Sequence, residues 1–416
     1  MDKTKGLSNG LIAGIAVVIV IVVLVAILHH TPSPATASTT ANPAVNSSIP
    51  MHNQSATIKA TTTISVTSSI IQQNQSTTTN HTIASPINVI ANITVGLGPY
   101  FATYDSGNGY IYVPDPGSDT ISVISGTSVV SNVTVTAGYS VLRSATYDPG
   151  NGYVYVPDPG SNTTVSVISG TSVVGNVTVG YSPLFATYDP GNGYIYVPDQ
   201  GSNTVSVISG TSVVGTIAVG SNPYSATYDS GNGYIYVTNY GSNTVSVISD
   251  TSVVGNVTVG YSPLSATYDS GNGYIYVTNY GSNTVSVISG TSVVGNVTVG
   301  YFPQFATYDS GNGYIYVTNY GSGTVSVISG TSVVGNVTVT VGYSVLRYAT
   351  YDPGNGYVYV PNQYSGQVAV ISGTSVVGTV TDKSSPESAT YDPGNGYVYV
   401  VNLNPGHFGT IFVLGS

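Results

Sequence analysis

The chain has no cysteine, no tryptophan and one glutamate, and only six of its 416 residues are basic. Without cysteine, disulfides and thiolate metal sites are excluded. Charged residues make up 5% of the chain, against about 25% in a typical soluble protein. The formal net charge of −10 leaves no basic patch for nucleic acid. His407 is the only histidine after residue 81, so histidine-rich metal sites and haem ligation are not expected there.

A repeated sequence motif accounts for most of the chain after residue 101. Ala-Thr-Tyr-Asp is followed each time by Gly-Asn-Gly-Tyr-(Ile/Val)-Tyr-Val. Each period of 40 to 43 residues contains four runs rich in Val, Ile, Tyr and Thr, separated by Gly, Asn, Ser and Asp. Four strands per period of about 40 residues are typical of one blade of a β-propeller. The eight copies begin at Ala102, Ala145, Ala186, Ala226, Ala266, Ala306, Ala349 and Ala389.

The end of the repeat array indicates how the ring closes. The last copy, from Ala389, contains three strand-like runs and lacks the fourth. The segment 88–95, NVIANITV, precedes the first copy and matches the fourth run of the others. We therefore predict an all-β, eight-bladed β-propeller whose last blade is completed by this N-terminal strand. Closure would also cover sheet edges that an open array exposes.

The first 86 residues differ from the repeats. Residues 11–28 are eighteen apolar residues, about 27 Å as a helix against a bilayer core of roughly 30 Å. Lys3 and Lys5 precede this run, which places residues 1–10 in the cytoplasm by the positive-inside rule. We favour a retained single-pass membrane anchor over a secretory signal cleaved near Ala37, and both readings export the rest. Residues 29–86, rich in Ser, Thr and Asn, are predicted to be a disordered stalk before a propeller at 87–416.

Residues 87–416 resemble the surface-layer YVTN family of β-propeller proteins. The motif stands at 236–239, 276–279 and 316–319 as Tyr-Val-Thr-Asn, and the Thr-Val-Ser-Val-Ile runs and Val-Gly-x-x-Pro links also match. The resemblance implies a cell-surface protein of archaea or bacteria, with no single activity. It also implies seven blades, where the repeats give eight. The first three copies depart from it, with Tyr-Val-Pro-Asp in place of the motif.

The links between strands predict a binding face. If the strands of a blade are named A to D outward, the B–C and D–A links share one face. These links vary, whereas the A–B and C–D links hardly change. We predict that the variable face contacts a protein or glycan, since Tyr and Asn suit either partner; drift in solvent-exposed loops is the alternative. The predicted contact residues are Asp115, Asp158, Asp199, Asn239, Tyr240, Asn279, Tyr280, Asn319, Tyr320, Arg143 and Arg347.

Catalytic motifs are missing from the repeats. We find no catalytic set of Ser, His and Asp, no pair of Glu residues and no Gly-rich phosphate loop. We therefore expect no catalytic residue, no metal and no cofactor. The Asp of each Ala-Thr-Tyr-Asp copy is expected to bond its own turn rather than join a ring of Ca²⁺ ligands. The sequence thus predicts a non-catalytic surface binding or adhesion module. The alternatives are a structural component that assembles laterally in a surface layer, and a propeller lyase, hydrolase or quinoprotein.

Asn-x-(Ser/Thr) sequons recur along the chain and predict a glycoprotein. They occur in the stalk, in the fourth strand of most repeats and in one B–C link. Chance is the alternative, because a β-rich repeat full of Thr and Asn produces such triplets. The predicted N-glycosylation sites are Asn46, Asn53, Asn74, Asn80, Asn92, Asn132, Asn162, Asn176, Asn256, Asn296 and Asn336.

Overall fold

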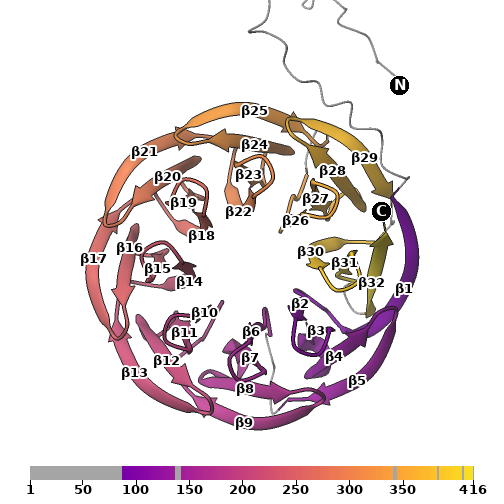
Figure 1. The fold of residues 1–416 in the computed structure, drawn as a ribbon, viewed down its shortest axis with the longest axis horizontal. Coiled ribbons are helices and arrows are strands. Elements are labelled where there is room, and N and C mark those ends of the chain that lie inside the picture. The colour runs from indigo at the N-terminus through magenta and orange to yellow at the C-terminus, as the bar shows by residue number, and fades with distance from the viewer. Residues whose placement is uncertain (1–86, 136–141, 341–343, 382–383, 405–406, 416) are drawn as a thin grey trace, which may run out of the picture. The chain divides into compact units, whose positions relative to one another are not determined.

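The computed structural model describes residues 87–416 except 136–141, 341–343, 382–383, 405–406 and 416. Eight four-stranded antiparallel sheets surround a central axis as the blades of a propeller (Figure 1). Eight blades confirm the number predicted from the repeats, and the seven implied by the family resemblance are wrong. The predicted cytoplasmic segment, anchor and stalk at 1–86 lie outside the described residues. Among the described residues, no helix is long and apolar enough to cross a membrane.

The inner half of each blade consists of strands A and B. Strand A lies next to the axis, and strand B follows it through a short turn (Figure 1). The A strands are β2 (Thr103–Asp105), β6 (Thr146–Asp148), β10 (Thr187–Asp189), β14 (Pro223–Asp229), β18 (Pro263–Asp269), β22 (Pro303–Asp309), β26 (Thr350–Asp352) and β30 (Pro386–Asp392). The B strands are β3 (Tyr110–Asp115), β7 (Tyr153–Asp158), β11 (Tyr194–Asp199), β15 (Tyr234–Asn239), β19 (Tyr274–Asn279), β23 (Tyr314–Asn319), β27 (Tyr357–Asn362) and β31 (Tyr397–Asn402).

Strands C and D form the outer half, with two short 3₁₀ helices, η1 (Pro116–Ser118) and η2 (Pro159–Ser161), in B–C links. The C strands are β4 (Thr120–Ser125), β8 (Thr164–Ser169), β12 (Thr204–Ser209), β16 (Thr244–Ser249), β20 (Thr284–Ser289), β24 (Thr324–Ser329), β28 (Gln367–Ser372) and β32 (Phe408–Gly415). The D strands are β1 (Asn88–Leu97), β5 (Ser128–Thr134), β9 (Ser172–Thr178), β13 (Ser212–Ala218), β17 (Ser252–Thr258), β21 (Ser292–Thr298), β25 (Ser332–Thr338) and β29 (Ser375–Thr381).

The ring closes as the sequence predicts. Strand β1 pairs with β32 in antiparallel register, with Asn88 opposite Gly415, and becomes strand D of the last blade. Hydrogen bonds also join the last blade to the first, since the Thr390 hydroxyl donates to the Ala102 carbonyl at 2.7 Å. The Tyr399 hydroxyl donates to the carbonyl of Gly126 at 2.8 Å. Residues about 290 apart in the chain are therefore neighbours at this seam.

The second Tyr of each B strand holds neighbouring blades together. Tyr236 is fully buried against Ile275 and Val277 of the next blade. Its hydroxyl accepts a hydrogen bond from Asn232 Nδ2 at 3.1 Å and donates to the Gly290 carbonyl of the next blade at 2.9 Å. A buried phenol needs such partners. The second Tyr of strand B thus serves blade packing.

The Asp of the Ala-Thr-Tyr-Asp motif stabilises its own turn. Asp229 Oδ1 accepts the backbone N–H of Gly231 at 2.8 Å, and Gly233 N–H donates to the Asp229 carbonyl at 2.8 Å. Gly233 takes a φ of +76°, which favours glycine. This turn role is the one predicted, and among the described residues no three His, Asp or Glu side chains gather as a metal site.

Candidate binding face

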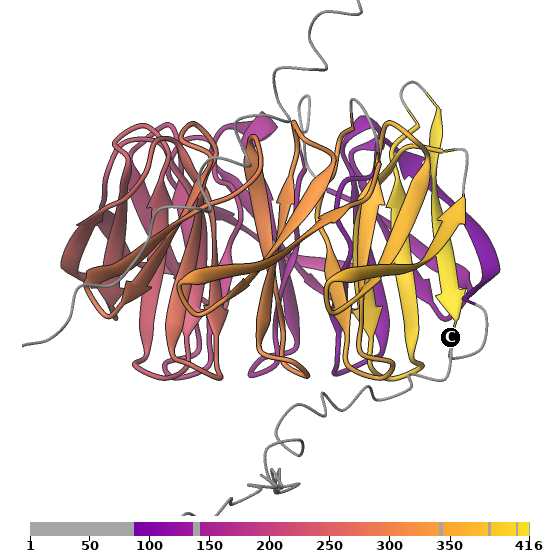
Figure 2. The same cartoon turned by 90° about the horizontal axis from the view of Figure 1, so that it is seen from above.

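The variable links gather on one face of the ring. The D–A link pairs with the B–C link of the same blade: Tyr240 N–H donates to the Asn222 carbonyl, and Gly241 N–H to the Ser221 carbonyl, both at 2.9 Å. The same pairing recurs in other blades, as between Gly201 and Tyr181. Figure 2 shows the ring from the side, with turns and links collected at its two faces. We call the face formed by the D–A and B–C links the variable face.

Exposed aromatic rings mark this face. Tyr181, Tyr261 and Tyr301 occupy the same position in three D–A links and are 62%, 67% and 63% exposed. In the B–C links Tyr240 is 36% exposed, and the predicted contact residues Tyr280 and Tyr320 are half-buried. Tyr is enriched at protein interfaces relative to the rest of the surface, so these rings are candidate contact residues. The three D–A tyrosines were not predicted, although the recurrent Gly-Tyr-x-Pro link could have indicated them.

Two of the predicted tyrosines contact other rings or a cation. Tyr280 stacks on Phe302 with ring centroids 5.0 Å apart. The Arg347 guanidinium lies over the Tyr320 ring, 5.5 Å from its centroid. The structure therefore brings the tyrosines of the B–C links together with residues of the D–A links.

Six predicted contact residues do not face outward, and this part of the prediction is wrong. All end a B strand and are 0–1% exposed, so they are not available to a partner. Asn239 Nδ2, for example, donates to Thr244 Oγ1 at 3.1 Å and Ser246 Oγ at 3.0 Å. These side chains fasten the B–C link inside the blade, as buried polar groups require. The six are Asp115, Asp158, Asp199, Asn239, Asn279 and Asn319.

These buried side chains explain the Gly that begins most D–A links. A Cβ on Gly180 would lie 2.6 Å from Asp199 Cγ, and one on Gly220 would lie 2.7 Å from Asn239 Cγ. Only glycine leaves room for the carboxyl or amide at this close approach. The Val-Gly-x-x-Pro pattern is thus a packing requirement of the B strand of the next blade.

Aromatic side chains cross the axis where strand A begins. Phe101 and Phe305 lie against Tyr348, with ring centroids 3.9 Å and 3.4 Å away. Phe185, from a blade nearly opposite, lies 5.8 Å from Phe101 and 6.3 Å from Tyr348. We call these four residues the axial cluster. The sequence interpretation did not identify these four residues.

Charged residues surround the axial cluster. Arg347 Nε lies 3.3 Å from Glu387 Oε1, and Arg347 Nη2 donates to Gln363 Oε1 at 3.2 Å. The Arg143 guanidinium lies 5.3 Å from the centroid of the Tyr100 ring, a cation–π distance. Burial raises the pKa of Glu387, and the nearby Arg347 opposes that rise.

Both predicted arginines therefore reach the centre of the variable face. Glu387, which is fully buried, was missed. A usable signal existed, because the position two residues before each repeated Ala differs widely among the copies. That position holds Tyr100, Arg143, Leu184, Tyr224, Leu264, Gln304, Arg347 and Glu387.

The sequons of the propeller lie at its surface. Asn92, Asn132, Asn176, Asn256, Asn296 and Asn336 are exposed on D strands, and Asn162 is exposed in a B–C link. In five blades the Asn Oδ1 accepts from a Ser hydroxyl of strand C at 2.7–3.0 Å, as Ser246 does for Asn256. This bond leaves Nδ2, the atom that carries a glycan, to solvent. Glycan occupancy stays a prediction, and the four stalk sequons lie outside the described residues.

No protein-family model and no curated protein sequence matches the chain. Solved propellers resemble its structure. Virginiamycin B lyase from Staphylococcus aureus has a TM-score of 0.55 at 13% identity, covering 78% of this chain and 98% of that chain. The C-terminal WD40 domain of Sif2 has a TM-score of 0.55 at 10% identity, covering 80% and 96%. Kuenenia stuttgartiensis hydrazine synthase has a TM-score of 0.51 at 18% identity, covering 65% and 94%.

These similarities establish the class of the protein as a β-propeller. At identities of 10–18% they show the fold alone. The neighbours include enzymes and WD40 domains, so they do not choose between catalysis and binding. The likeness to the YVTN surface-layer family stays a prediction.

Proposed function

We propose that the propeller is a non-catalytic binding or adhesion module whose variable face contacts a protein or glycan at the cell surface. The observation that carries this proposal is the row of exposed tyrosines in equivalent D–A links, Tyr181, Tyr261 and Tyr301. Tyr combines a flat apolar area with a hydroxyl and loses little conformational entropy on binding. Few charged residues lie near these tyrosines in the sequence, so the free-energy cost of desolvating this surface on binding is low.

Three further observations favour binding over catalysis. The axial cluster places four aromatic rings at the axis, and the three Phe side chains among them offer no acid, base or nucleophile. His407, the one histidine of the propeller, is exposed in the last B–C link. Glu387 is fully buried beside Arg347, so its carboxyl is not exposed to solvent or to a substrate at the surface.

Replacing Tyr181, Tyr261 and Tyr301 together with Ala should remove binding. We expect immobilised propeller (87–416) to retain specific envelope proteins or glycoconjugates, and the triple variant to retain at least tenfold less, because exposed aromatic anchors carry most interface energy. Quantitative retention and surface plasmon resonance of the eluted partner would measure this. The triple variant of Tyr240, Tyr280 and Tyr320 tests the other links of the same face. Undiminished retention by both variants would show that the partner does not bind this face.

Lateral assembly into a surface layer is a second candidate, favoured by the outer strands. Val254, Val294 and Val334 are 47–48% exposed at the same position of three D strands. No D strand carries a charged residue, whereas unpaired edge strands usually carry charge or Pro against self-pairing.

Electron microscopy of the purified propeller on a lipid monolayer tests this second function. We expect ordered arrays if lateral assembly operates, and we expect the triple variant of Val254, Val294 and Val334 to Lys to abolish them. The variant Tyr181→Ala, Tyr261→Ala, Tyr301→Ala is the matched control and should leave the arrays intact. A propeller that stays monomeric at all concentrations would refute this role.

A further inference from the structure

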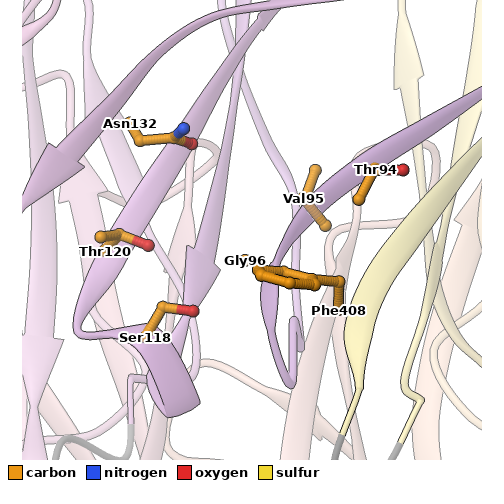
Figure 3. A pocket seen from close by; sticks show the side chains of 7 residues that line it. All are labelled: Thr94, Val95, Gly96, Ser118, Thr120, Asn132 and Phe408. Carbon is orange, nitrogen blue, oxygen red and sulfur yellow. The ribbon is translucent and has the colours of Figure 1, made fainter.

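A groove lies at the seam where the last blade meets the first. It has a volume of about 350 Å³ and is lined by Thr94, Val95, Gly96, Ser118, Thr120, Asn132 and Phe408. Its volume is in the lower range of small-molecule sites in proteins. Strand β1 and Phe408 at the start of β32 form one wall, and η1 with strands β4 and β5 forms the other (Figure 3).

The two walls differ in chemistry. Phe408 is 63% exposed, and Figure 3 shows its ring extending toward the opposite wall. Ser118, Thr120 and Asn132 point toward it from that wall (Figure 3). The Ser118 hydroxyl accepts the N–H of Leu97 at 2.6 Å, which leaves its own proton to donate.

The opposite wall also offers a fixed amide. Asn132 Oδ1 accepts from Ser122 Oγ at 3.0 Å, which leaves Nδ2 to donate toward the groove. None of the described residues that line the groove is charged. It therefore combines one exposed aromatic ring with uncharged donors and acceptors.

An equivalent groove elsewhere in the ring lacks the aromatic wall. The groove of about 360 Å³ between the third and fourth blades is lined by Ala218, Gly220, Ser242, Thr244 and Asn256, among others. By strand register, Ala218 and Thr244 correspond to Thr94 and Thr120 of the seam. No aromatic side chain is among the described residues that line this second groove, so nothing there takes the place of the Phe408 ring. A groove of this kind thus recurs between blades of the propeller, and at the seam the last blade adds the aromatic side chain of Phe408 to it.

We propose that the seam groove is a binding subsite for one neutral hexose-type sugar unit of an external glycan. The apolar face of a pyranose ring would stack on Phe408, while its hydroxyls would bond to Ser118, Thr120 and Asn132. The absence of a lining charge favours a neutral sugar over a uronate or phosphate, which would need a cationic partner. This inference rests on the proposed binding function and assigns one ligand class to a specific place at the margin of the variable face.

Saturation-transfer NMR on the full chain tests the site. The chain is made in a host without N-glycosylation, so that a glycan on Asn132 cannot fill the groove. The probes are glucose, galactose, mannose and N-acetylglucosamine, with glucuronate as the charged control. We expect saturation transfer to at least one neutral sugar and weaker transfer to glucuronate. The variant F408S, which removes the aromatic ring, should weaken binding about tenfold, and F408Y should retain it.

The outcomes separate this inference from the proposed function. Sugar binding that is unchanged in F408S, absent from the wild type, or stronger for glucuronate would overturn the seam site. The variant Tyr181→Ala, Tyr261→Ala, Tyr301→Ala should keep sugar binding at the seam, because none of these residues lines the groove. Retention of envelope partners by the triple tyrosine variant, measured separately, tests the variable face without altering the groove. A circular dichroism melt matching that of the wild type shows that each variant is folded.

Discussion

Replacing Asp115 and Asp199 with Asn should stabilise the propeller at pH 7.5 and leave its stability almost unchanged at pH 4. Both carboxyls are fully buried, and no cation lies beside either among the described residues. One oxygen of each carboxyl, Oδ1, has no hydrogen-bond partner. Five other blades carry Asn at this position (Asn239, Asn279, Asn319, Asn362 and Asn402). An Asn, like a protonated Asp, is neutral and can donate a hydrogen bond to the Ser of strand C.

The direction of the effect follows from burial. Burial raises the pKa of Asp115 to about 7 and that of Asp199 to about 6, from an ordinary 3.8. Each folded carboxyl therefore keeps its proton when the unfolded one has lost it. Below about pH 4 both states are protonated and neither Asp costs stability. Between about pH 4 and 7 the unfolded state ionises first, so the free energy of unfolding falls as pH rises.

The penalty at neutral pH is on the order of 3 kcal/mol for each carboxyl. The double variant should recover much of it, and its midpoint in guanidinium denaturation at pH 7.5 should rise accordingly. Part of the pH dependence should remain, because burial also raises the pKa values of Asp189, Asp309, Asp352 and Glu387.

The matched control is Asp250→Asn, which removes the same charge from an exposed C–D turn. We expect this control to change the free energy of unfolding by less than about 0.5 kcal/mol at either pH. Equal midpoints for the wild type and the double variant at pH 7.5, or a gain equally large at pH 4, would show that the buried carboxyls do not impose this penalty.

Removing strand β1 should open the ring. We expect a chain that starts at residue 98 to lose cooperative unfolding and to self-associate, whereas 87–416 unfolds in one transition. Ile93 and Val95 of β1 are buried at the seam, and their exposure alone costs roughly 3 to 6 kcal/mol. Strand β32 would also present an unpaired edge to other chains. Equilibrium denaturation and analytical ultracentrifugation measure the two effects.

A circular permutant supplies the control for this deletion. Asn88 lies opposite Gly415 in the β1–β32 ladder, so a two-residue Asn-Gly turn can join them as a hairpin. A chain running from residue 98 to 415, then through this turn to residues 88–97, contains every strand and should regain the stability of 87–416. If the chain from residue 98 unfolds like 87–416, closure through β1 is not what holds the ring.

We propose binding at the two variable-face tyrosine sets and at the seam groove, and not at the axis. The axial cluster fills the centre with Phe101, Phe185, Phe305 and Tyr348, and its contacts join blades on opposite sides of the ring. Loops at the margin of a rigid propeller can change without disturbing blade packing. The invariant A–B turns and buried tyrosines supply that rigid support.

The sequence by itself determined the fold class, the eight blades and the closing strand. These properties are written in local patterns: alternating Val, Ile and Tyr in each strand, an Asp-x-Gly-Asn-Gly turn in each A–B link, and one orphan fourth strand at 88–95. Each of these patterns determines the local structure of a few neighbouring residues. Because the patterns recur in all eight copies, the strands predicted for one blade are predicted for every blade.

The tertiary structure decided which residues are exposed and which meet. Asp115 and Tyr240 both lie in or beside B–C links, yet one is buried in the blade and the other is exposed. Arg347 and Glu387 lie near Tyr100 because the ring closes and brings the last blade beside the first, across 288 residues of the chain. Side-chain direction at a strand end and the proximity of distant links depend on ring closure, which no local pattern records.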